Sequence, residues 1–361
     1  MERIDVAVIG AGVTGLASAV EILKSGRSVC VLERHPRPGL ETSTHNSGVI
    51  HAGIYYPADS LKAKMCVEGR RLLYEYCAAR GVAHANCGKL IVAADAAEIA
   101  PLERLFAQGT ANGARLEMVD RAFIAGREPH VAAEAALYAP ESGIVHAEGL
   151  VKALARDAEG EGAILLRGTR LDGADATPDG IVIRTSRESI LAAQVVNAAG
   201  LYADDVSAML GGEAFRIYPV RGEYVELAPN RRHLARALVY PLPHAHSLGV
   251  HVVKTTDGAV WFGPTARYQE RKDDYESDRL PVEAFLEPAR RLLPEIELAD
   301  LRLSGSGIRP KLQTPSEAFA DFLIRRDRRN PAVVQAAGIE SPGLTSCLAV
   351  GRLVAEIVGE G

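Results

Sequence analysis

Several features that would mark a specialised class of protein are missing from this chain of 361 residues. The five cysteines are an odd number, include no C-x-x-C pair and have no histidine pair beside them. This pattern excludes a disulfide framework and a zinc site, and it predicts a reducing compartment and no metal. No run of about 20 apolar residues is present, and the apolar residues 4–9 are too few for a signal-peptide core.

Neither sign of charge dominates the composition. Lys and Arg number 41 against 46 Asp and Glu, a formal charge of −5, so no net field favours nucleic acid or anionic lipid. The chain is 47% hydrophobic, 24% charged and only 5% aromatic, which is typical of a folded globular protein and excludes disorder, collagen repeats and coiled coil. We expect a cytoplasmic protein with, at most, a peripheral contact on the inner membrane face.

The first 33 residues have the pattern of a βαβ unit. Residues 4–9 predict an unbroken, mostly apolar strand, and residues 28–33 predict a second one. Between them Leu16, Val20 and Leu23 recur at helical spacing, and Gly26 stands where a left-handed residue would end the helix.

A glycine motif, GAGVTG, joins the first strand to this helix. Gly10 permits a tight turn, Gly12 lets backbone approach a pyrophosphate, and Gly15 allows the helix to pack on the strand. Glu33 ends the second strand, where its carboxylate would bind a ribose 2′-hydroxyl and repel a 2′-phosphate. FAD or NAD is therefore expected and NADP disfavoured. The alternative is a glycine turn that binds nothing.

The remaining segments predict two interleaved domains of mixed α/β class. A Rossmann-like domain would comprise residues 1–85, 144–214 and 304–361, and an antiparallel-sheet substrate domain would comprise residues 86–143 and 215–303. We expect an amphipathic helix that begins at the N-cap Ser60 and ends at Gly81. Turns are expected at Asp172-Gly173 and at Asp179-Gly180.

Three separated segments together resemble the FAD-binding domain of the D-amino-acid-oxidase superfamily. They are the glycine motif, the strand and turn at residues 194–200, and the glycine-rich residues 338–343 before a final helix at residues 344–358. The resemblance implies non-covalently bound FAD. It also implies that the last helix directs its positive N-terminal end to the flavin pyrimidine edge, where it would stabilise negative charge.

Further segments are similar to the FAD-dependent L-2-hydroxyglutarate dehydrogenase/oxidase family of that superfamily. The longest is residues 45–56 (HNSGVIHAGIYY), and shorter ones are residues 60–64, 73–77, 87–92, 218–224 and 248–251. Residues 269–300 are shorter than in that family, and Gly343-Leu344-Thr345 replaces its alanine-rich lead into the last helix. The resemblance implies oxidation of a small 2-hydroxy acid to the 2-oxo acid by hydride transfer to flavin N5.

Candidate site residues follow from these motifs. His51 and His251 are alternative general bases for the hydroxyl proton, because the pKa of an imidazole lies near working pH. Arg309, in a Gly-Ser loop followed by Pro310, would hold the substrate carboxylate through its planar guanidinium, with Tyr55 and Lys254 as additional contacts. We interpret the other histidines, including His244 and His246, as surface or structural residues. The resemblance implies FAD contacts from Gly10, Gly12, Val13, Thr14, Gly15, Glu33, Arg34, Thr42, Ser43, Asn46, Ser47, Gly48, Val49, Leu171, Ala199, Gly200, Gly338, Gly343, Leu344 and Thr345.

Alternatives remain open at this stage. A flavin amine oxidase of the glycine- or D-amino-acid-oxidase type would share the carboxylate contact, and a non-catalytic flavin-binding module would share the fold. Oxygen, a quinone or an electron-transfer protein could each accept the electrons. The basic run at residues 325–329 is typical of a solvated turn, with an anionic-lipid patch as its alternative.

Overall fold

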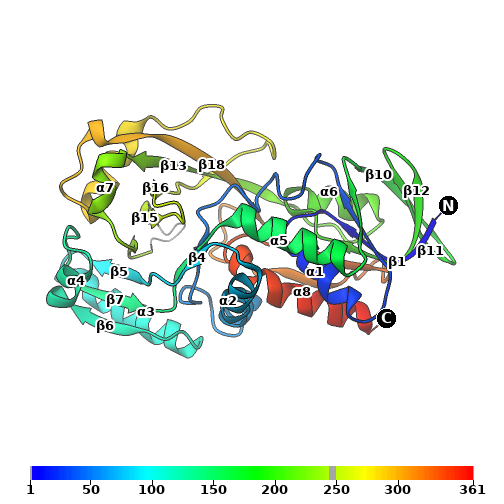
Figure 1. The fold of residues 1–361 in the computed structure, drawn as a ribbon, viewed down its shortest axis with the longest axis horizontal. Coiled ribbons are helices and arrows are strands. Elements are labelled where there is room, and N and C mark those ends of the chain that lie inside the picture. Colours follow the sequence, from blue (N-terminus) through cyan, green and yellow to red (C-terminus); the bar gives the residue numbers. More distant parts are fainter. Residues whose placement is uncertain (1, 244–248, 361) are drawn as a thin grey trace. The chain divides into compact units, whose positions relative to one another are not determined.

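The computed structural model describes residues 2–243 and 249–360, and the chain folds into two compact units. Unit 1 comprises Met1–Thr44, Ala147–Pro219 and Arg309–Gly361, and unit 2 comprises His45–His146 and Val220–Ile308 (Figure 1). Each unit has its own mixed or antiparallel sheet, so the fold is the mixed α/β class that the sequence predicts. No helix in the described part of the chain combines the length and apolar character needed to span a bilayer.

The division of the chain differs from the predicted one over residues 45–85. We predicted that they continue the dinucleotide domain, but they group with unit 2. The reason is strand pairing: β3 (Val49–Ile50) and β4 (His84–Ala85) both pair antiparallel with β8 (Gly143–Val145). Ile54 is also buried in the same hydrophobic cluster as Leu102.

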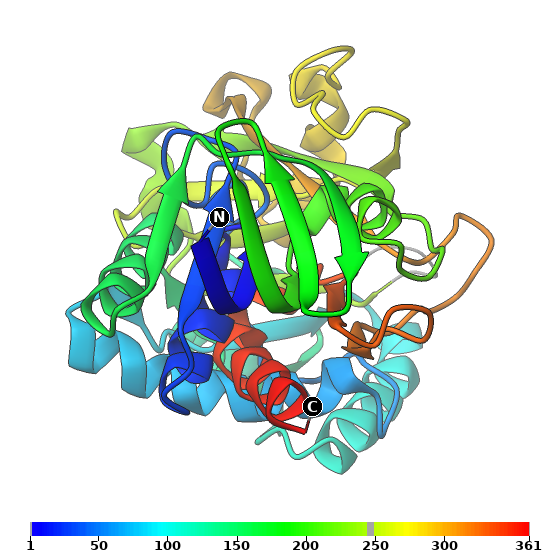
Figure 2. The same cartoon turned by 90° about the vertical axis from the view of Figure 1, so that its right-hand side faces the viewer.

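Unit 1 is built on a sheet whose central strands are parallel. In the order β9, β2, β1, β12, β20 each strand pairs parallel with the next, and the strands β11 and β10 extend the sheet antiparallel from β12. Figure 2 shows the strands β10–β12 in green beside the blue β1, with the red helix α8 below them. The elements of unit 1 are β1 (Glu2–Ile9), α1 (Val13–Leu23), β2 (Val29–Glu33), α5 (Ala147–Gly160), β9 (Ile164–Arg167), β10 (Leu171–Thr177), β11 (Gly180–Thr185), β12 (Ser189–Asn197), α6 (Ala203–Met209), β19 (Leu323–Arg326), β20 (Val333–Ala337) and α8 (Gly343–Gly359).

Unit 2 contains a long, mainly antiparallel sheet. Its strand order is β17-β13-β16-β15-β14-β5-β7-β6, with β18 beside β13, and β14 and β5 pair parallel. The chain passes between the units within β13 and β18. The elements are α2 (Leu61–Arg80), β5 (Lys89–Ala93), α3 (Ile99–Ala111), β6 (Glu117–Asp120), α4 (Arg121–Arg127), β7 (Ala135–Ala139), β13 (Tyr218–Leu227), β14 (Leu238–Pro241), β15 (His251–Lys254), β16 (Val260–Gly263), β17 (Arg267–Tyr268), α7 (Leu286–Leu292) and β18 (Leu301–Lys311), besides β3, β4 and β8.

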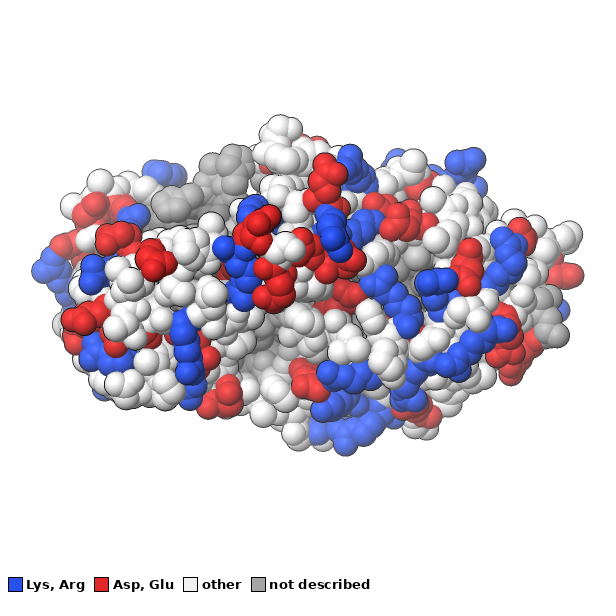
Figure 3. Space-filling view, turned by 90° about the horizontal axis from the view of Figure 1, so that it is seen from above, with Lys and Arg blue, Asp and Glu red and all other residues white. Residues whose placement is uncertain are grey.

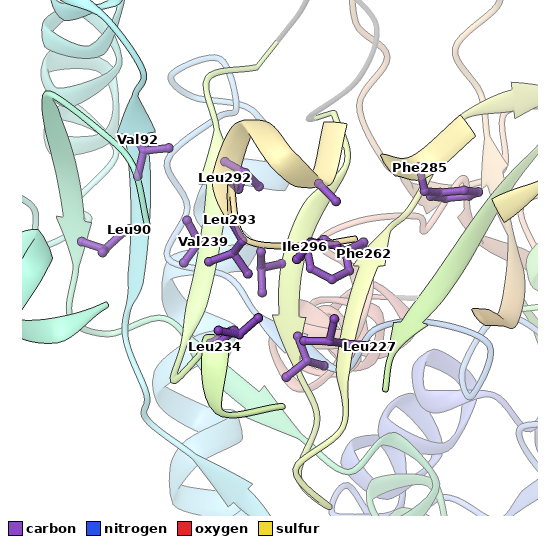
Figure 4. Close-up of a cluster of buried hydrophobic side chains, with 14 of the residues drawn as sticks. Leu90, Val92, Leu227, Leu234, Val239, Phe262, Phe285, Leu292, Leu293 and Ile296 are labelled. Atoms are coloured by element: carbon purple, nitrogen blue, oxygen red, sulfur yellow. The ribbon is translucent and has the colours of Figure 1, made fainter. Parts of the chain in front are cut away.

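The unit 2 sheet buries apolar side chains on both faces. On one face Val239 of β14 and Phe262 of β16 pack against Leu292 and Ile296 from the α7 region (Figure 4). Burying each such side chain contributes about 1.5–3 kcal/mol. Side chains alternate along each strand, so Tyr240 and its neighbours turn to the opposite face, where they meet a second cluster that contains Ile54 and Leu102.

Local signals predict the structure correctly where a helix has its own caps. Helix α2 spans Leu61–Arg80, the Ser60 hydroxyl accepts a hydrogen bond from the Ala63 N–H at 3.1 Å, and Gly81 is left-handed with φ +66°. The turn at Asp179-Gly180 is also present, between β10 and β11. The turn predicted at Asp172-Gly173 is wrong: both residues lie within β10, where a register shift next to Gly173 accommodates the glycine.

Surface charge is mixed on the face that Figure 3 shows, with red and blue side chains interspersed. The basic run at residues 325–329 is partly internal. Arg326 donates hydrogen bonds to the carbonyls of Pro331, at 2.8 Å, and of Ile357 at the end of α8. Arg325 pairs with Glu213, and Asp327 is only 4% exposed. These side chains hold unit 1 together, which a solvated turn would not do.

Helices α1 and α8 approach closely because of one glycine. A Cβ placed on Gly351 of α8 would lie 2.7 Å from the carbonyl carbon of Ala17 in α1. Backbone at that distance leaves no room for a methyl group, and the two helices would have to separate. Gly351 therefore sets the position of α8 on α1.

We expect Gly351→Val to lower the free energy of unfolding by about 1–3 kcal/mol through overpacking. Urea unfolding followed by circular dichroism measures the change. Gly359→Ala, at the other end of α8 where a Cβ meets nothing within 4 Å, is the matched control and should unfold like the parent. Equal stability of Gly351→Val and the control would contradict the close helix contact.

Candidate active site

The glycine turn of unit 1 lies where the carboxyl ends of β1 and β12 meet. Gly10 has φ +104°, and a Cβ there would lie 2.6 Å from the Ala198 carbonyl oxygen. A Cβ on Gly15 would overlap the Gly10 carbonyl oxygen. Both positions therefore require glycine, Gly10 for its conformation and Gly15 for the contact between α1 and the turn.

The N-terminus of α1 opens beside Gly12. The Gly12 backbone is extended, with φ −76°, and a Cβ there would lie 2.8 Å from the Ser43 hydroxyl. That hydroxyl accepts a hydrogen bond from the Val13 N–H at 3.0 Å. The structure describes every residue of the first turn of α1, and none of them is acidic. A helix end with backbone N–H groups and no competing carboxylate suits a phosphate group.

Glu33 is buried at the end of β2, 6% exposed. Its carboxylate accepts hydrogen bonds from the N–H groups of Ala11, at 3.0 Å, and His35, at 2.8 Å. Burial raises the pKa of Glu33, and these two hydrogen bonds oppose the increase. A carboxylate has about four acceptor sites, so two used by backbone leave capacity for ribose hydroxyls.

The other residues expected at the flavin have varied surroundings. The Arg34 guanidinium stacks on the Tyr202 ring, 3.6 Å from its centroid, and pairs with Glu41. Leu171 is 5% exposed in the core of unit 1, which leaves only its backbone for a ligand. In unit 2, Gly48 has φ +66° and donates its N–H to the Asn46 side chain at 2.9 Å. Among the remaining residues, Thr42 and Ser47 lie in loops and Val49 lies in β3. Gly338 lies in the loop before α8, and the first three residues of that helix are Gly343, Leu344 and Thr345.

A buried polar network that the sequence did not reveal supports the turn at Ala199 and Gly200. The Asn197 side-chain amide donates to the Gln335 side chain at 2.8 Å and to the Ala203 carbonyl at 2.7 Å. Gln335 in turn donates to Asp327 at 2.7 Å. The network ties β12 to β20 at the end of the sheet where the glycine turn lies. Unit 1 thus has the fixed turns, the helix N-terminus and the buried carboxylate that fit FAD.

In unit 2, the segment that carries His51 and Tyr55 is held from two helices. From α2, Arg70 donates to the Ala52 carbonyl at 3.0 Å and the Cys66 thiol lies 3.5 Å from the His51 carbonyl. From the end of α3, its C-cap residue Asn112 donates to the carbonyls of Gly53 and Tyr56 at 3.0 and 2.8 Å. None of these supporting residues was singled out from the sequence, because polar residues on helices resemble ordinary surface residues there.

His51 and His251 belong to one group of side chains. The imidazole of His251 stacks on the Tyr240 ring, with centroids 3.7 Å apart and planes 20° apart. Its Nδ1 lies 3.0 Å from the Gly249 carbonyl, which can only accept, so Nδ1 carries a proton and Nε2 is the basic nitrogen of the neutral ring. Burial, Lys89 and His251 together hold the pKa of His51 well below its usual value. A neutral imidazole is the form that can accept a proton.

Lys89 completes this group, and sequence reasoning missed it. Its Nζ lies 4.8 Å from the centroid of the Tyr55 ring and 4.6 Å from that of the Tyr240 ring. The side chain is 1% exposed, and burial lowers its pKa to about 7. The signal was available: Lys89 alternates with Ile91 and Ala93 on one side of an apolar strand, so its side chain had to face a core.

The two basic residues expected to hold substrate are placed differently. Arg309 lies in the strand β18, so the predicted Gly-Ser loop is wrong; glycine is needed at position 307 because its backbone passes against the His45 carbonyl. Arg309 is partly exposed. Lys254 follows His251 by three residues in β15, and alternation turns it to the opposite face, where it donates to the Ala235 carbonyl at 3.3 Å. The structure therefore does not bring Lys254 to the histidines. His244, His246 and Leu248 lie outside the described residues.

We expect Gly12→Asp to purify without bound flavin, because a carboxylate at the start of α1 would occupy and repel the position of a pyrophosphate. The flavin absorbance per protein, with circular dichroism as the check on folding, measures this. Gly160→Ala, at a helix end where a Cβ meets nothing within 4 Å, is the control and should retain the flavin. A folded Gly12→Asp protein with full flavin content would contradict the assignment of this turn.

Lys89 also predicts a pH dependence of stability. Its pKa is about 7 in the folded protein, against 10.5 for an ordinary lysine. Between these values the unfolded chain binds more protons, so Lys89 makes the free energy of unfolding increase with pH, and its cost is largest below about pH 7. We expect Lys89→Met to stabilise the protein more at pH 6 than at pH 9 in urea unfolding. Lys254→Met is the control on the opposite face, and the same gain for Lys89→Met at both pH values would show that the ammonium is not desolvated.

Comparison with known proteins places these observations in a family. The family model described as "FAD dependent oxidoreductase" (DAO) matches residues 5–357. The chain is 36% identical to the mitochondrial L-2-hydroxyglutarate dehydrogenase of Arabidopsis thaliana, over 98% of this chain and 83% of that protein. It is 30% identical to the L-2-hydroxyglutarate dehydrogenase of Escherichia coli K12, over 96% of this chain and 91% of that protein.

Solved structures agree on the fold. The FAD-bound L-alpha-glycerophosphate oxidase from Mycoplasma pneumoniae superposes with a TM-score of 0.91 at 28% identity, covering 99% of this chain and 95% of that one. Glycine oxidase from Geobacillus kaustophilus superposes with a TM-score of 0.84 at 25% identity, covering 100% and 95% of the two chains. The predicted cofactor, FAD, and the predicted reaction class are confirmed. With its glycine turn, buried Glu33 and near-complete family match, this chain belongs to the DAO family of FAD-dependent oxidoreductases.

Proposed function

We propose that this enzyme oxidises L-2-hydroxyglutarate, or a closely similar L-2-hydroxy acid, to the corresponding 2-oxo acid. Relatives with this name are 30–36% identical over at least 96% of the chain. Similarity over this length includes both units and the segments that carry His51, His251 and Arg309.

The observation that carries the proposal is a buried group in unit 2 that contains two histidines, with a buried lysine beside the tyrosine on which His251 stacks. An alcohol keeps its hydroxyl proton at neutral pH, so its oxidation needs a positioned acceptor, whereas an α-amine can lose a proton without one. His51 is held neutral, and His251 has a defined basic nitrogen. These features favour a hydroxy acid over an amino acid as the substrate.

Each part of the chain then has a defined task. FAD, when bound, accepts the hydrogen from Cα of the substrate with its electron pair. The glycine turn, the N-terminus of α1 and Glu33 would hold its pyrophosphate and ribose. His51 or His251 accepts the hydroxyl proton. Arg309 binds the carboxylate beside the reacting carbon through a bidentate contact, which fixes Cα for the reaction.

A second candidate is oxidation of a glycerol phosphate. The similarity to L-alpha-glycerophosphate oxidase, with a TM-score of 0.91, supports it directly. That substrate is also an alcohol, so it needs the same base, and a guanidinium binds phosphate as readily as carboxylate. The two candidates therefore differ in the anionic group of the substrate.

A substrate panel separates these functions. The flavin-loaded protein is mixed anaerobically, at constant pH, with L-2-hydroxyglutarate, D-2-hydroxyglutarate, L-lactate, glycerol 3-phosphate and glycine, and loss of the flavin absorbance is recorded. We expect L-2-hydroxyglutarate to bleach the flavin fastest and the D-isomer to be ineffective. Preferential bleaching by glycerol 3-phosphate would establish the second candidate, and preferential bleaching by glycine would contradict alcohol oxidation.

The proposed roles predict opposite kinetic effects for Arg309 and the histidines. Arg309 meets a carboxylate that is charged before the reaction, so Arg309→Ala should raise KM strongly and lower kcat less. A general base acts only as the proton moves, so His51→Gln or His251→Gln should slow flavin reduction about 10²–10⁴-fold with little change in substrate affinity. Steady-state and stopped-flow kinetics measure the two effects.

Arg302→Ala is the matched control for Arg309, because Arg302 lies in the same strand with its side chain 56% exposed. Its KM should match that of the parent. An unchanged KM in Arg309→Ala would move the carboxylate contact to another residue, and parental reduction rates in both histidine variants would remove the base from the proposed function.

A further inference from the structure

The neighbouring strands β12 and β20 bury two amide side chains next to each other. Asn197 is paired with Gln335 in the parallel register, and both residues are 0% exposed. Burying an amide has a cost unless its hydrogen bonds are made, and apolar side chains could fill the same space in the core of unit 1. The two amides therefore need an explanation beyond packing.

Gln335 connects several side chains of unit 1. Its amide group donates to the Asp327 carboxylate at 2.7 Å and to the Ser207 hydroxyl at 2.8 Å. Its side-chain oxygen accepts from the Asn197 amide at 2.8 Å. The Ser207 hydroxyl in turn donates to the Glu213 carbonyl at 2.8 Å. A buried side chain with three such partners is held in one position, because any displacement would leave a polar group unpaired in a medium of low dielectric constant.

Asp327 anchors one end of these hydrogen bonds. Its carboxylate, 4% exposed, accepts from the N–H groups of Arg329 and Asn330 at 2.8 Å each and of Glu213 at 2.9 Å. Burial opposes the charge of Asp327, but the hydrogen bonds from Gln335 and from backbone lower its pKa, so the carboxylate is ionised near neutral pH. An ionised acceptor makes stronger hydrogen bonds than a neutral one, and Gln335 is thereby attached to a fixed point.

Asn197 extends the network to the turn that follows β12. Its amide group donates to the Ala203 carbonyl at 2.7 Å, and its side-chain oxygen accepts from the Ala199 N–H at 3.4 Å. The bond to the Gln335 oxygen determines which way the Asn197 amide faces, since that oxygen can pair only with the NH₂ group. The Asn197 oxygen is then directed to Ala199.

This turn lies directly against the first glycine of the dinucleotide motif. A Cβ on Gly10 would lie 2.6 Å from the Ala198 carbonyl oxygen and 3.2 Å from the Ala199 Cα. The Ala198 N–H also donates to the Ile9 carbonyl at 3.0 Å. Backbone in such close contact is not easily deformed, so a displaced turn would displace Gly10 and the start of α1.

We propose that Gln335 is a positioning residue for FAD: acting through Asn197, it holds residues 198–200 against the glycine motif and so increases the affinity for the cofactor. The hydrogen bonds of the Gln335 side chain go to other side chains, and its effect on the cofactor therefore passes through Asn197. The proposal concerns cofactor binding and does not depend on which substrate the enzyme oxidises.

The test measures release of FAD from the loaded protein, as the increase in flavin fluorescence on serial dilution, which gives the FAD dissociation constant. Gln335→Met keeps the length of the side chain and removes its hydrogen bonds, and we expect the constant to rise about fivefold to tenfold. Asn197→Leu removes the contact to Ala199 directly and should raise the constant at least as much.

Val333→Ala is the matched control, because Val333 is a fully buried residue of the same strand, two positions before Gln335. The cavity that it leaves should lower the free energy of unfolding, measured in urea, without changing the FAD dissociation constant. This control separates a loss of stability in unit 1 from a loss of positioning at the turn.

A double variant tests whether Gln335 acts through Asn197. If it does, Gln335→Met combined with Asn197→Leu should release FAD no more readily than Asn197→Leu alone, because the connection to the turn is already lost. If Gln335 only stabilises the fold, the two effects on the dissociation constant should multiply.

A parental dissociation constant in folded Gln335→Met would overturn the proposal. Multiplied effects in the double variant, or equal weakening in Val333→Ala, would overturn it too. If Gln335→Met does not fold, Ser207→Ala replaces it, because this change removes one partner of Gln335 and leaves the other two. We then expect about a twofold to threefold rise in the constant, and an unchanged value would contradict the proposal.

Discussion

The turn from Gly10 to Gly15 brings three stretches of backbone closer together than side chains would allow. Gly10 lies against Ala198 at the end of β12, and Gly15 lies against Gly10 itself. These contacts fix the start of α1 at the carboxyl end of the parallel strands, where its N–H groups and dipole favour an anion. The position of Glu33, of the Ala199–Gly200 turn and of α8 all depend on that packing, since each is attached to β1, β12 or α1.

Unit 2 follows a different physical rule, the desolvation of charge. Its sheet buries a lysine and stacks a histidine on a tyrosine within one apolar layer. Desolvation favours the neutral imidazole of His51 and weakens the hold of Lys89 on its proton. An enzyme that removes a proton from an alcohol needs a neutral base, and in the proposed function this environment would supply it. In the proposed function, unit 1 would hold the cofactor and unit 2 would supply the neutral base.

Sequence reasoning succeeds where the physical cause is local. The glycine motif, the caps of α2 and the final helix follow from neighbouring residues, and the structure has all of them. It fails where the cause is tertiary. Gly173 and the Gly-Ser stretch before Arg309 have the composition of turns, yet each lies in a strand: Gly173 stands beside a register shift, and Gly307 leaves room for the distant backbone of His45. Asp327 has the sequence context of a solvated basic run, but its partner Gln335 arrives from the next strand. The sequence favours Lys254 over Lys89 as a site residue, although Lys89 begins one apolar strand and Lys254 ends another. Only the strand register shows that Lys89, and not Lys254, lies on the sheet face of His251.

The central claim is that this protein removes hydrogen from C2 of L-2-hydroxyglutarate while a histidine accepts the hydroxyl proton. The most direct measurement is an anaerobic single turnover with L-2-hydroxyglutarate carrying deuterium at C2, compared with the unlabelled compound by stopped-flow absorbance. The account predicts that both compounds bleach the flavin, that the deuterated one does so several-fold more slowly, and that one equivalent of 2-oxoglutarate forms per flavin. Absence of bleaching by either compound in protein with full flavin content would contradict it.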